Sequence, residues 1–426
     1  MKWRQLLVLT AVRAARIAHG QTLEDVLTSQ AATLSTLNSW LLSEELIFEV
    51  MSNAQGITLL APSNNAISQL YNTALATQLA TDPNLLTAFL SYHVLNGVYQ
   101  MSDFTSNRLG SFPTFMNMAG YSNVSGGQTI ETLSENGAVT FITGNGAETN
   151  VETYDFKYAG GTLHIIDSVL TIPGSVTDTL LSGGRTAAVG ALRRAGIEDA
   201  LNAASDVTIF VPTNDAFNAI GSTVNSMTLE QLTQVLNYHI IQGKVLYSQL
   251  ISGGSEATRE GNSINFRLGG GSLFVNSARI VDSDILVGNG VVHVVDNVLN
   301  PSNTTATPVT TASTQAPAFD GATTTTGGVP FTSAVVTTTT TSTSTHTGTA
   351  TATASATGAT SSGDPSALDS AAADTTIRAV VALGGVRAGW TVFWASCLAA
   401  AGDGWLGAGR VSALAMCASL ASLWYL

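Results

Sequence analysis

The sequence predicts an α+β fold that is present in two tandem copies and is followed by a segment unable to form a core. Three sequence blocks occur twice, in the same order, along the 426 residues. Within each copy the helical patterns come before the strand patterns, which is typical of α+β domains. An uncharged Thr/Ser-rich stretch follows the second copy. Together these observations predict two globular domains and an extended stalk.

The repeated blocks set the domain boundaries. They recur at offsets of 150, 146 and 129 residues: Thr58–Ile67 returns as Thr208–Phe217, Leu90–Val94 as Leu236–Ile240, and Gly161–Leu170 as Gly290–Leu299. The fall in the offset from 146 to 129 places extra residues in the first copy. We interpret Gly120–Asn136 as a surface insertion and expect domains at 21–173 and 174–301.

Local signals predict the elements of each copy in order. A short apolar strand stops at a proline, Pro62 or Pro212, which has no backbone N–H to donate to a sheet. The next residue, Ser63 or Thr213, carries a hydroxyl suited to capping a helix.

A second helix follows in each copy. It begins at Asp82-Pro83 in the first copy and at a capping box, Thr228 to Gln231, in the second. Apolar residues then recur with helical spacing up to a Tyr-His pair. Alternating and β-branched runs separated by glycines come afterwards and predict the strands.

The first twenty residues predict a secretory signal peptide. Positive charge at Lys2 and Arg4 precedes the apolar run Leu6–Val12, and small residues around Ala18 offer a cleavage site. We therefore expect residues 1–20 to be removed as the chain enters the secretory pathway.

The apolar C-terminal region, 378–426, predicts a signal for a glycosylphosphatidylinositol anchor. Residues 411–426 carry no charge and follow a short polar spacer and a run of small residues. Gly402 and Ser370 are the candidate attachment residues. A single membrane span is the alternative, although the uncharged tail is short for a hydrocarbon core of about 30 Å.

Residues 302–377 predict a disordered, O-glycosylated stalk. Residues 321–360 contain 18 Thr, 4 Ser and no charge, so little can be buried to offset the entropy of ordering the backbone. Such tracts are typical of O-glycosylated stalks, and an unmodified linker is the alternative. Asn123 and Asn303 each begin an Asn-x-Ser/Thr sequence and are candidate N-glycosylation sites.

Charge and cysteine content exclude several classes of function. The net charge is −13 and the chain has only three lysines, which argues against nucleic acid as a partner. Both cysteines, Cys397 and Cys417, lie near the C-terminus, so residues 21–300 hold no disulfide or thiolate metal site. The one match to a dinucleotide fingerprint starts at Gly402, outside any strand–helix context. We expect no cofactor.

Four histidines, His93, His164, His239 and His293, come as repeat-related pairs. An enzyme or metal site would recruit them with Asp167 or Asp296. However, the spacing His-x-x-Asp on a strand puts the two side chains on opposite faces. We therefore interpret the histidines as structural, bonded to the backbone, and expect neither catalysis nor a bound metal.

The repeated blocks resemble those of fasciclin domains. The segment Asn289–Leu299 matches the last block, Asn-Gly-x-x-His-x-x-Asp-x-x-Leu, in full, whereas the first copy has Gly160 in place of the asparagine. The resemblance implies a seven-stranded β wedge with packed helices in each copy. It assigns a structural role to eight motif residues: Pro62, Asn64, His164, Asp167, Pro212, Asn214, His293 and Asp296.

The same resemblance implies an adhesive face. The family's Asp-Ile adhesion motif resembles Asp284-Ile285, and the corresponding pair in the first copy is Asp155-Phe156. The Tyr-His pairs are expected to lie at the same corner, so the candidate adhesive residues are Tyr92, His93, Tyr238, His239, Asp284 and Ile285.

These observations predict a non-enzymatic adhesion or extracellular-matrix protein, lipid-anchored at the outer face of the plasma membrane or in the cell wall. Its partners would be cell-surface or matrix proteins, or polysaccharide. One alternative is a structural wall or matrix glycoprotein that binds polysaccharide through Tyr121, Tyr154 or Tyr158. Another is a fasciclin-like protein of the vacuolar membrane.

Overall fold

The computed structural model describes residues 20–332, except 44, 106–108 and 326. The predicted signal peptide (1–20, apart from its last residue), Ser370, Gly402 and the apolar region 378–426 lie outside the described residues. No helix within the described part of the chain is long and apolar enough to cross a membrane.

The first domain contains seven helices, one 3-10 turn and seven strands among its described residues. Its helices are α2 (Leu23–Ser29), α3 (Ala31–Ser43), α4 (Glu45–Asn53), α5 (Asn64–Leu70), α6 (Ala74–Thr81), α7 (Pro83–Tyr92) and α8 (Met101–Thr105), with the turn η1 (Gly144–Gly146). Its strands are β1 (Ile57–Pro62), β2 (Val94–Asn96), β3 (Leu109–Pro113), β4 (Thr129–Glu135), β5 (Ala138–Ile142), β6 (Glu148–Tyr158) and β7 (Gly161–Ile166).

The second domain repeats this order. Its helices are α9 (Val176–Ser182), α10 (Thr186–Ala195), α11 (Glu198–Asn202), α12 (Asn214–Ala219), α13 (Gly221–Ser226) and α14 (Leu229–Asn237), with the 3-10 turn η2 (Ser248–Leu250). Its strands are β8 (Val207–Pro212), β9 (Ile240–Gln242), β10 (Gly254–Ala257), β11 (Ser263–Gly269), β12 (Ser272–Val275), β13 (Ala278–Val287) and β14 (Gly290–Val295).

Each domain is built on one seven-stranded sheet, and the two sheets have the same topology. The strand order is β2-β1-β7-β6-β5-β4-β3 in the first and β9-β8-β14-β13-β12-β11-β10 in the second. One parallel pair lies inside each sheet, β1 with β7 and β8 with β14, and the other pairs are antiparallel. The predicted pair of α+β domains with seven strands each is confirmed.

The predicted helix starts are confirmed as well. Ser63 caps α5 by accepting a hydrogen bond from the N–H of Ala66, and Thr213 caps α12 in the same way. Asp82 accepts from two N–H groups at the start of α7, directly before a proline. Thr228 and Gln231 form the expected capping box of α14.

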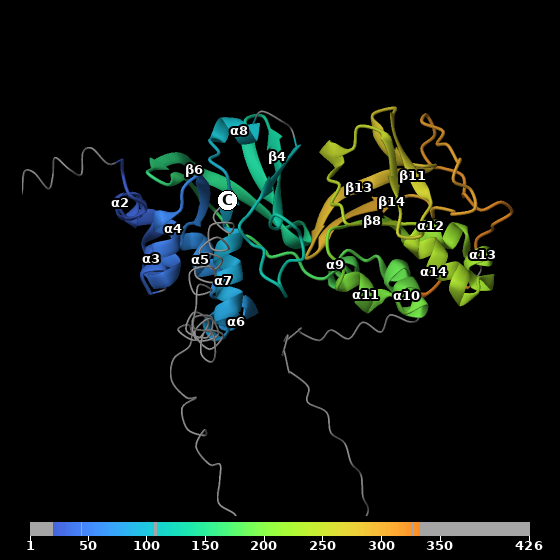
Figure 1. Ribbon diagram of the computed structural model, residues 1–426, viewed down its shortest axis with the longest axis horizontal. Coiled ribbons are helices and arrows are strands. Elements are labelled where there is room, and N and C mark those ends of the chain that lie inside the picture. Colours follow the sequence, from blue (N-terminus) through green and yellow to red (C-terminus); the bar gives the residue numbers. More distant parts are fainter. Residues whose placement is uncertain (1–19, 44, 106–108, 326, 333–426) are drawn as a thin grey trace, which may run out of the picture. The chain divides into compact units, whose positions relative to one another are not determined.

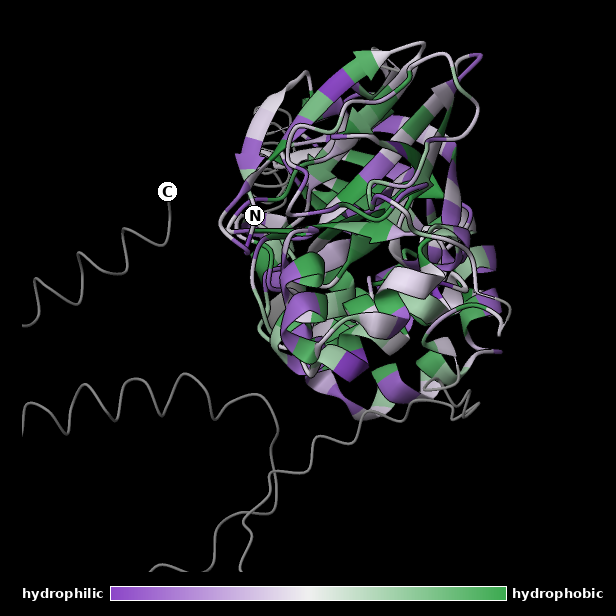
Figure 2. Ribbon diagram, turned by 90° about the vertical axis from the view of Figure 1, so that its right-hand side faces the viewer, coloured by the Kyte–Doolittle hydropathy of each residue, from purple (hydrophilic) through white to green (hydrophobic). Residues whose placement is uncertain are grey.

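The helices of the second domain gather along one side of its sheet, as Figure 1 shows for α9 to α14. Strands β8 and β14 are buried along their whole length. In Figure 2 the hydrophobic colour accordingly follows the central strands, while hydrophilic residues mark the outer turns of the helices. Burial on both faces explains why these strands are continuous apolar runs rather than alternating ones.

The extra residues of the first copy form a joint with the second domain. The β3–β4 connection runs from 114 to 128, whereas the corresponding β10–β11 connection runs only from 258 to 262. The Nε2 of Gln128 donates to the carbonyl of Val287 over 2.8 Å, and the Asn123 N–H donates to the carbonyl of Gly288 over 2.8 Å. The interpretation of Gly120–Asn136 as a surface insertion therefore needs correction: the loop contacts the second domain through these bonds, although Ser125 and Gly126 are exposed, and residues 129–135 belong to β4.

The second domain extends further along the chain than the predicted boundary at 301. Residues 301–332, here called the strap, lie against it (orange in Figure 1). The side-chain amides of Asn297 and Asn300 donate to the carbonyls of Ala316 and Ala318. The Phe331 ring meets the Phe217 ring edge-on, with centroids 6.0 Å apart. The strap is thus held to the second domain by hydrogen bonds and one aromatic contact, and Ala318 in it is buried.

Candidate functional site

The two Tyr-His pairs lie at the ends of helices α7 and α14, inside the domains. Tyr92 and Tyr238 are 0% exposed, and His93 and His239 are 2% and 3% exposed. The Tyr92 hydroxyl donates to the carbonyl of Thr129 over 3.1 Å, and that of Tyr238 donates to the carbonyl of Ser263 over 3.0 Å. Each tyrosine thus ties its helix to the β4 or β11 side of the sheet.

His93 and His239 each join two backbone segments. The Nδ1 of His93 lies 2.7 Å from the carbonyl oxygen of Phe89, and its Nε2 accepts from the N–H of Leu170 over 3.0 Å. His239 makes the same pair of bonds to Val235 and Leu299. Because one nitrogen must donate and the other must accept, both rings are neutral and held in one tautomer. Burial lowers the pKa of each ring to about 4.

His164 and His293 stand beside a bulge in the long strand of each sheet. Asp155 and Asp284 adopt left-handed conformations, with φ of 64° and 61°, where the ladder register shifts. The Asp155 N–H donates to Nδ1 of His164 over 3.2 Å, and the Asp284 N–H donates to Nδ1 of His293 over 3.3 Å. Burial lowers the pKa of both histidines, so these rings are neutral clamps on the bulge.

The aspartate carboxylates at the bulges are engaged too. Asp284 accepts from both the N–H and the hydroxyl of Ser248 at the start of η2. Asp155 accepts from the N–H of Met101 at the start of α8 over 2.9 Å. Each carboxylate therefore fixes the start of a short helical segment, α8 in the first domain and η2 in the second.

The remaining motif residues hold neighbouring elements together. Asn64 accepts from the N–H of Thr36 over 2.9 Å, and Asn214 accepts from the N–H of Ala187 over 3.1 Å. Asp167 and Asp296 accept from the N–H of Asn150 and Arg279, on the adjacent strand. Pro62 and Pro212 end β1 and β8. Each of these side chains serves the fold of its own domain.

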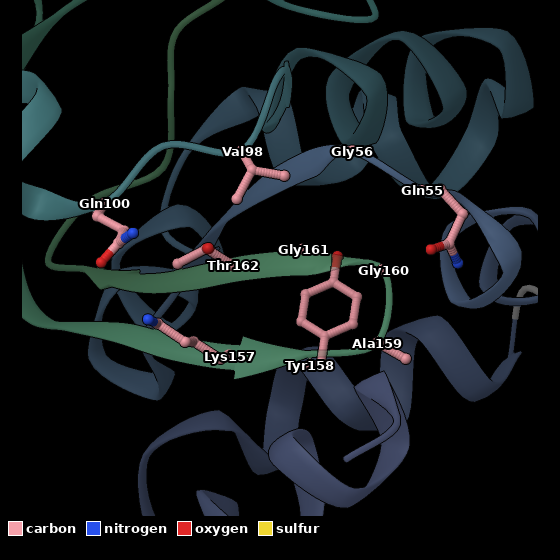
Figure 3. A pocket seen from close by; sticks show the side chains of 10 residues that line it. All are labelled: Gln55, Gly56, Val98, Gln100, Lys157, Tyr158, Ala159, Gly160, Gly161 and Thr162. Atoms are coloured by element: carbon pink, nitrogen blue, oxygen red, sulfur yellow. The ribbon is translucent and has the colours of Figure 1, made fainter. Parts of the chain in front are cut away.

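A shallow hollow of about 290 Å³ lies at the β6–β7 hairpin of the first domain (Figure 3). Lys157 and Tyr158 lie side by side on the hairpin, with Gln55 and Gln100 at opposite ends of the hollow. The Tyr158 hydroxyl is buried and has no hydrogen-bond partner in the described part of the chain, and burial raises its pKa to about 12. An unpartnered buried hydroxyl is costly, and Tyr158 is otherwise packed in the hydrophobic core of the first domain.

No group of three or more His, Cys, Asp or Glu side chains is arranged to hold a metal ion within the described ranges. The histidine nitrogens that a metal would need are already bonded to backbone groups. The motif residues thus form a network of hydrogen bonds that holds the described elements of each domain together.

The chain is similar in sequence to known proteins. The model of the fasciclin domain matches residues 32–173 and 183–301. A fasciclin-like arabinogalactan protein of Arthroderma benhamiae is 33% identical over 320 residues, 74% of this chain and 75% of that protein. The fasciclin-like arabinogalactan protein elcF of Phaeosphaeria nodorum is 29% identical over 276 residues, 64% of this chain and 86% of that protein. A solved FAS1 domain pair from the insect cell adhesion molecule Fasciclin I matches with a TM-score of 0.31 and 19% identity, over 64% of this chain and 98% of that one.

The chain belongs to the fasciclin family. Its two fasciclin domains are the two copies found in the sequence. The first match begins inside α3, after α2, and the second begins directly after α9.

The fasciclin fold corrects the expected adhesive face. Tyr92, His93, Tyr238 and His239 are enclosed in the core, so their side chains cannot contact a partner while the domains are folded. Asp284 and Ile285 are half-buried, and the Asp284 carboxylate is bonded to Ser248. Of the six candidate residues, only this pair reaches the surface.

Three residues of the joint between the fasciclin domains carried no recognisable sequence signal. Gln128 is fully buried, with Oε1 accepting from the Thr129 N–H and Nε2 donating to the second domain. Glu131 is 4% exposed, and burial raises its pKa to about 9. Asp206 accepts from the N–H and the hydroxyl of Ser125. Gln128 and Asp206 have partners 159 and 81 residues away in the other domain, so no local pattern marks these contacts.

Proposed function

We propose that this chain is a cell-surface adhesion or matrix-binding protein that presents two joined fasciclin domains to its partners. The observation that carries the proposal is the engagement of the motif side chains inside the domains. Such domains offer a partner a rigid surface rather than a catalytic centre. Fasciclin domains and fasciclin-like arabinogalactan relatives support a cell-surface adhesion or matrix role.

We place the contact of the first domain beside its strand bulge. Tyr154 comes directly before Asp155 and is 54% exposed, and bulges commonly re-aim side chains outward. Exposed aromatic residues are enriched at interfaces because they bury a large area at a small entropic cost. Replacing Tyr154 should therefore weaken adhesion without unfolding the domain.

Adhesion of cells that display the chain tests this proposal. Deletion of residues 21–332 should abolish attachment to cells or matrix, and Tyr154→Ala should reduce it several-fold. Leu229→Ala is the matched control, because Leu229 is 56% exposed on a helix of the other domain. Unchanged attachment after the deletion would sink the adhesive function, and equal loss in both point variants would move the contact elsewhere.

Polysaccharide binding is the second candidate function, and the hollow at Tyr158 favours it. A saccharide hydroxyl could pair with the Tyr158 hydroxyl, flanked by the side chains of Lys157 and Gln100. Tyr158→Phe should lower retention on purified wall glycans, whereas Tyr121→Phe, whose hydroxyl is already bonded to Asp82, should not. Equal retention of the wild type and Tyr158→Phe would exclude the hollow as a glycan site.

The topology of the whole chain belongs to the proposal as well. We propose a cleaved leader at 1–20, O-glycosylation after residue 332, and a lipid anchor attached at Gly402 or Ser370. Relatives support an extracellular or cell-wall location. Phosphatidylinositol-specific phospholipase should release a tagged protein from intact cells. Retention after treatment would favour a membrane span, and vacuolar fluorescence would favour the vacuolar alternative.

A further inference from the structure

The loop that joins the two fasciclin domains contains the sequence Asn123-Val124-Ser125. The backbone of Asn123 bonds to the second domain, whereas its side chain faces a hollow. The backbone of Asn123 is bonded to the second domain on both sides: its N–H donates to Gly288, and its carbonyl accepts from the Asp206 N–H over 3.2 Å. Its side-chain amide makes no hydrogen bond to the described residues and lines a hollow of about 330 Å³ together with Asn117, Ser122 and Ser205.

The hydroxyl of this sequence is not free in the folded protein. Ser125 donates from Oγ to Oδ2 of Asp206 over 2.6 Å, and its N–H donates to Oδ1 over 2.7 Å. An N-glycosylation acceptor needs both the asparagine amide and the hydroxyl two residues later. When the second domain docks, the Ser125 hydroxyl is therefore engaged by Asp206, whereas the side-chain amide of Asn123 stays open to solvent.

We infer that Asn123 carries an N-linked glycan that is added before the second domain docks and that then lies at the rim of the joint. This inference rests on the proposed secretory route. In the transfer, Nδ2 of Asn123 forms a bond to the anomeric carbon of an oligosaccharide as the bond from that carbon to its lipid pyrophosphate carrier breaks, and the amide loses one proton. The hollow beside Asn123 leaves room for the attached sugar.

The order of events follows from the position of Asp206 in the chain. It is made 83 residues after Asn123, which is about 4 to 17 s at synthesis rates of about 5–20 residues per second. During that interval the Ser125 hydroxyl has no carboxylate partner. Modification then leaves the joint intact, because the joint uses the backbone N–H and carbonyl of Asn123 and not its side-chain amide.

Peptide mass spectrometry of the full chain secreted from eukaryotic cells tests the inference. Asn123 should be modified in the wild type and in Ser125→Thr, and unmodified in Asn123→Gln and Ser125→Ala. Asp206→Asn should show the same occupancy as the wild type, because the glycan precedes docking. Higher occupancy in Asp206→Asn would overturn the proposed order, and unmodified wild-type Asn123 would overturn the site itself.

The modification of Asn303, in the strap, tells a failure of this inference apart from a failure of the secretory route on which it rests. Modified Asn303 with unmodified Asn123 would contradict only the joint glycan. If the chain with its own leader is not secreted, the secretory proposal fails. In that case the same chain behind a heterologous signal sequence still decides whether Asn123 is modified.

Discussion

At the scale of single residues, burial shifts the pKa of ionisable side chains inside each fasciclin domain and favours their neutral forms. His93 and His239 use both ring nitrogens on backbone groups and stay neutral. Glu131, beside the Asp284 and Tyr247 side chains of the second domain, is kept protonated by burial. These groups give the protein a pH dependence whose direction can be worked out group by group.

The histidines should make the body less stable in acid. Burial lowers the pKa of His93 and His239 from 6.5 to about 4, so between these values the unfolded chain binds more protons. Stability from each ring is complete above pH 6.5 and is lost toward pH 4, on the order of 3 kcal/mol per ring. Urea unfolding of the wild type and His239→Gln at pH 7, 5.5 and 4.5 checks this. A His239→Gln variant with the same pH slope as the wild type would contradict it.

Glu131 should act in the opposite direction. Its pKa is raised from 4.5 to about 9, so the folded state keeps a proton that the unfolded chain has lost, and stability falls as the pH rises between these values. Glu131→Gln retains an acceptor for the Ser111 hydroxyl, which donates to Glu131 over 2.6 Å. We expect the variant to be more stable than the wild type at pH 8, by on the order of 2 kcal/mol or more, with a smaller gain at pH 5. Equal melting temperatures at pH 8 would show that Glu131 ionises in place.

At the scale of elements, the strap is an integral part of the second domain. Arg194 of α10 lies 5.4 Å from the centroid of the Phe331 ring. A Cβ added at Gly190 would come within 2.2 Å of the Phe331 carbonyl oxygen, so the helix is shaped for the passing backbone. The corresponding helices of the first domain pack Trp40 against Tyr71 instead, with ring centroids 5.8 Å apart.

Substitutions of Phe331 in the strap and of Gly190 in α10 should perturb the same contact. Phe331→Ala should destabilise the second domain by about 1–3 kcal/mol, less than for a fully buried phenylalanine because the ring is half-buried. Gly190→Ala should have a similar effect, and the double variant should cost less than the sum of the two. Val309→Ala, 61% exposed in the same strap, is the control. Strictly additive effects of the two substitutions would contradict the contact.

The elements themselves could be predicted where their signals are local. Capping at Ser63, Thr213 and Thr228 depends on residues two or three positions away, and the strands that stop at Pro62 and Pro212 depend on one missing N–H. The predicted adhesive corner failed for the Tyr-His pairs because the resemblance carried residue identities and not burial. Whether such residues face the core or the solvent is known only when the helix or strand that packs against them is known.

At the scale of the whole molecule, the joint couples the described parts of the two fasciclin domains through buried hydrogen bonds. Gln128→Ala would leave the Val287 carbonyl and the Thr129 N–H unpaired, at about 1–3 kcal/mol for each buried group. We expect the single calorimetric transition of the wild-type body to split into two in this variant. Gln69→Ala, exposed on α5, should leave the transition unchanged. A wild-type body that already melts in two steps would show that the joint does not couple the domains.

The repeat, the order of elements in each domain and the helix caps could be predicted from the amino-acid sequence alone. These features depend on periodicity, on neighbours a few residues away, or on the recurrence of one pattern, all of which are visible in a linear chain. In contrast, the contact of the insertion with the second domain, the packing of the strap and the burial of Glu131 became visible only in the folded protein. The joint rests on contacts between residues 81 and 159 positions apart, and the strap on contacts between residues 18 to 101 positions apart. Such contacts form only when packing makes burial more favourable than solvation.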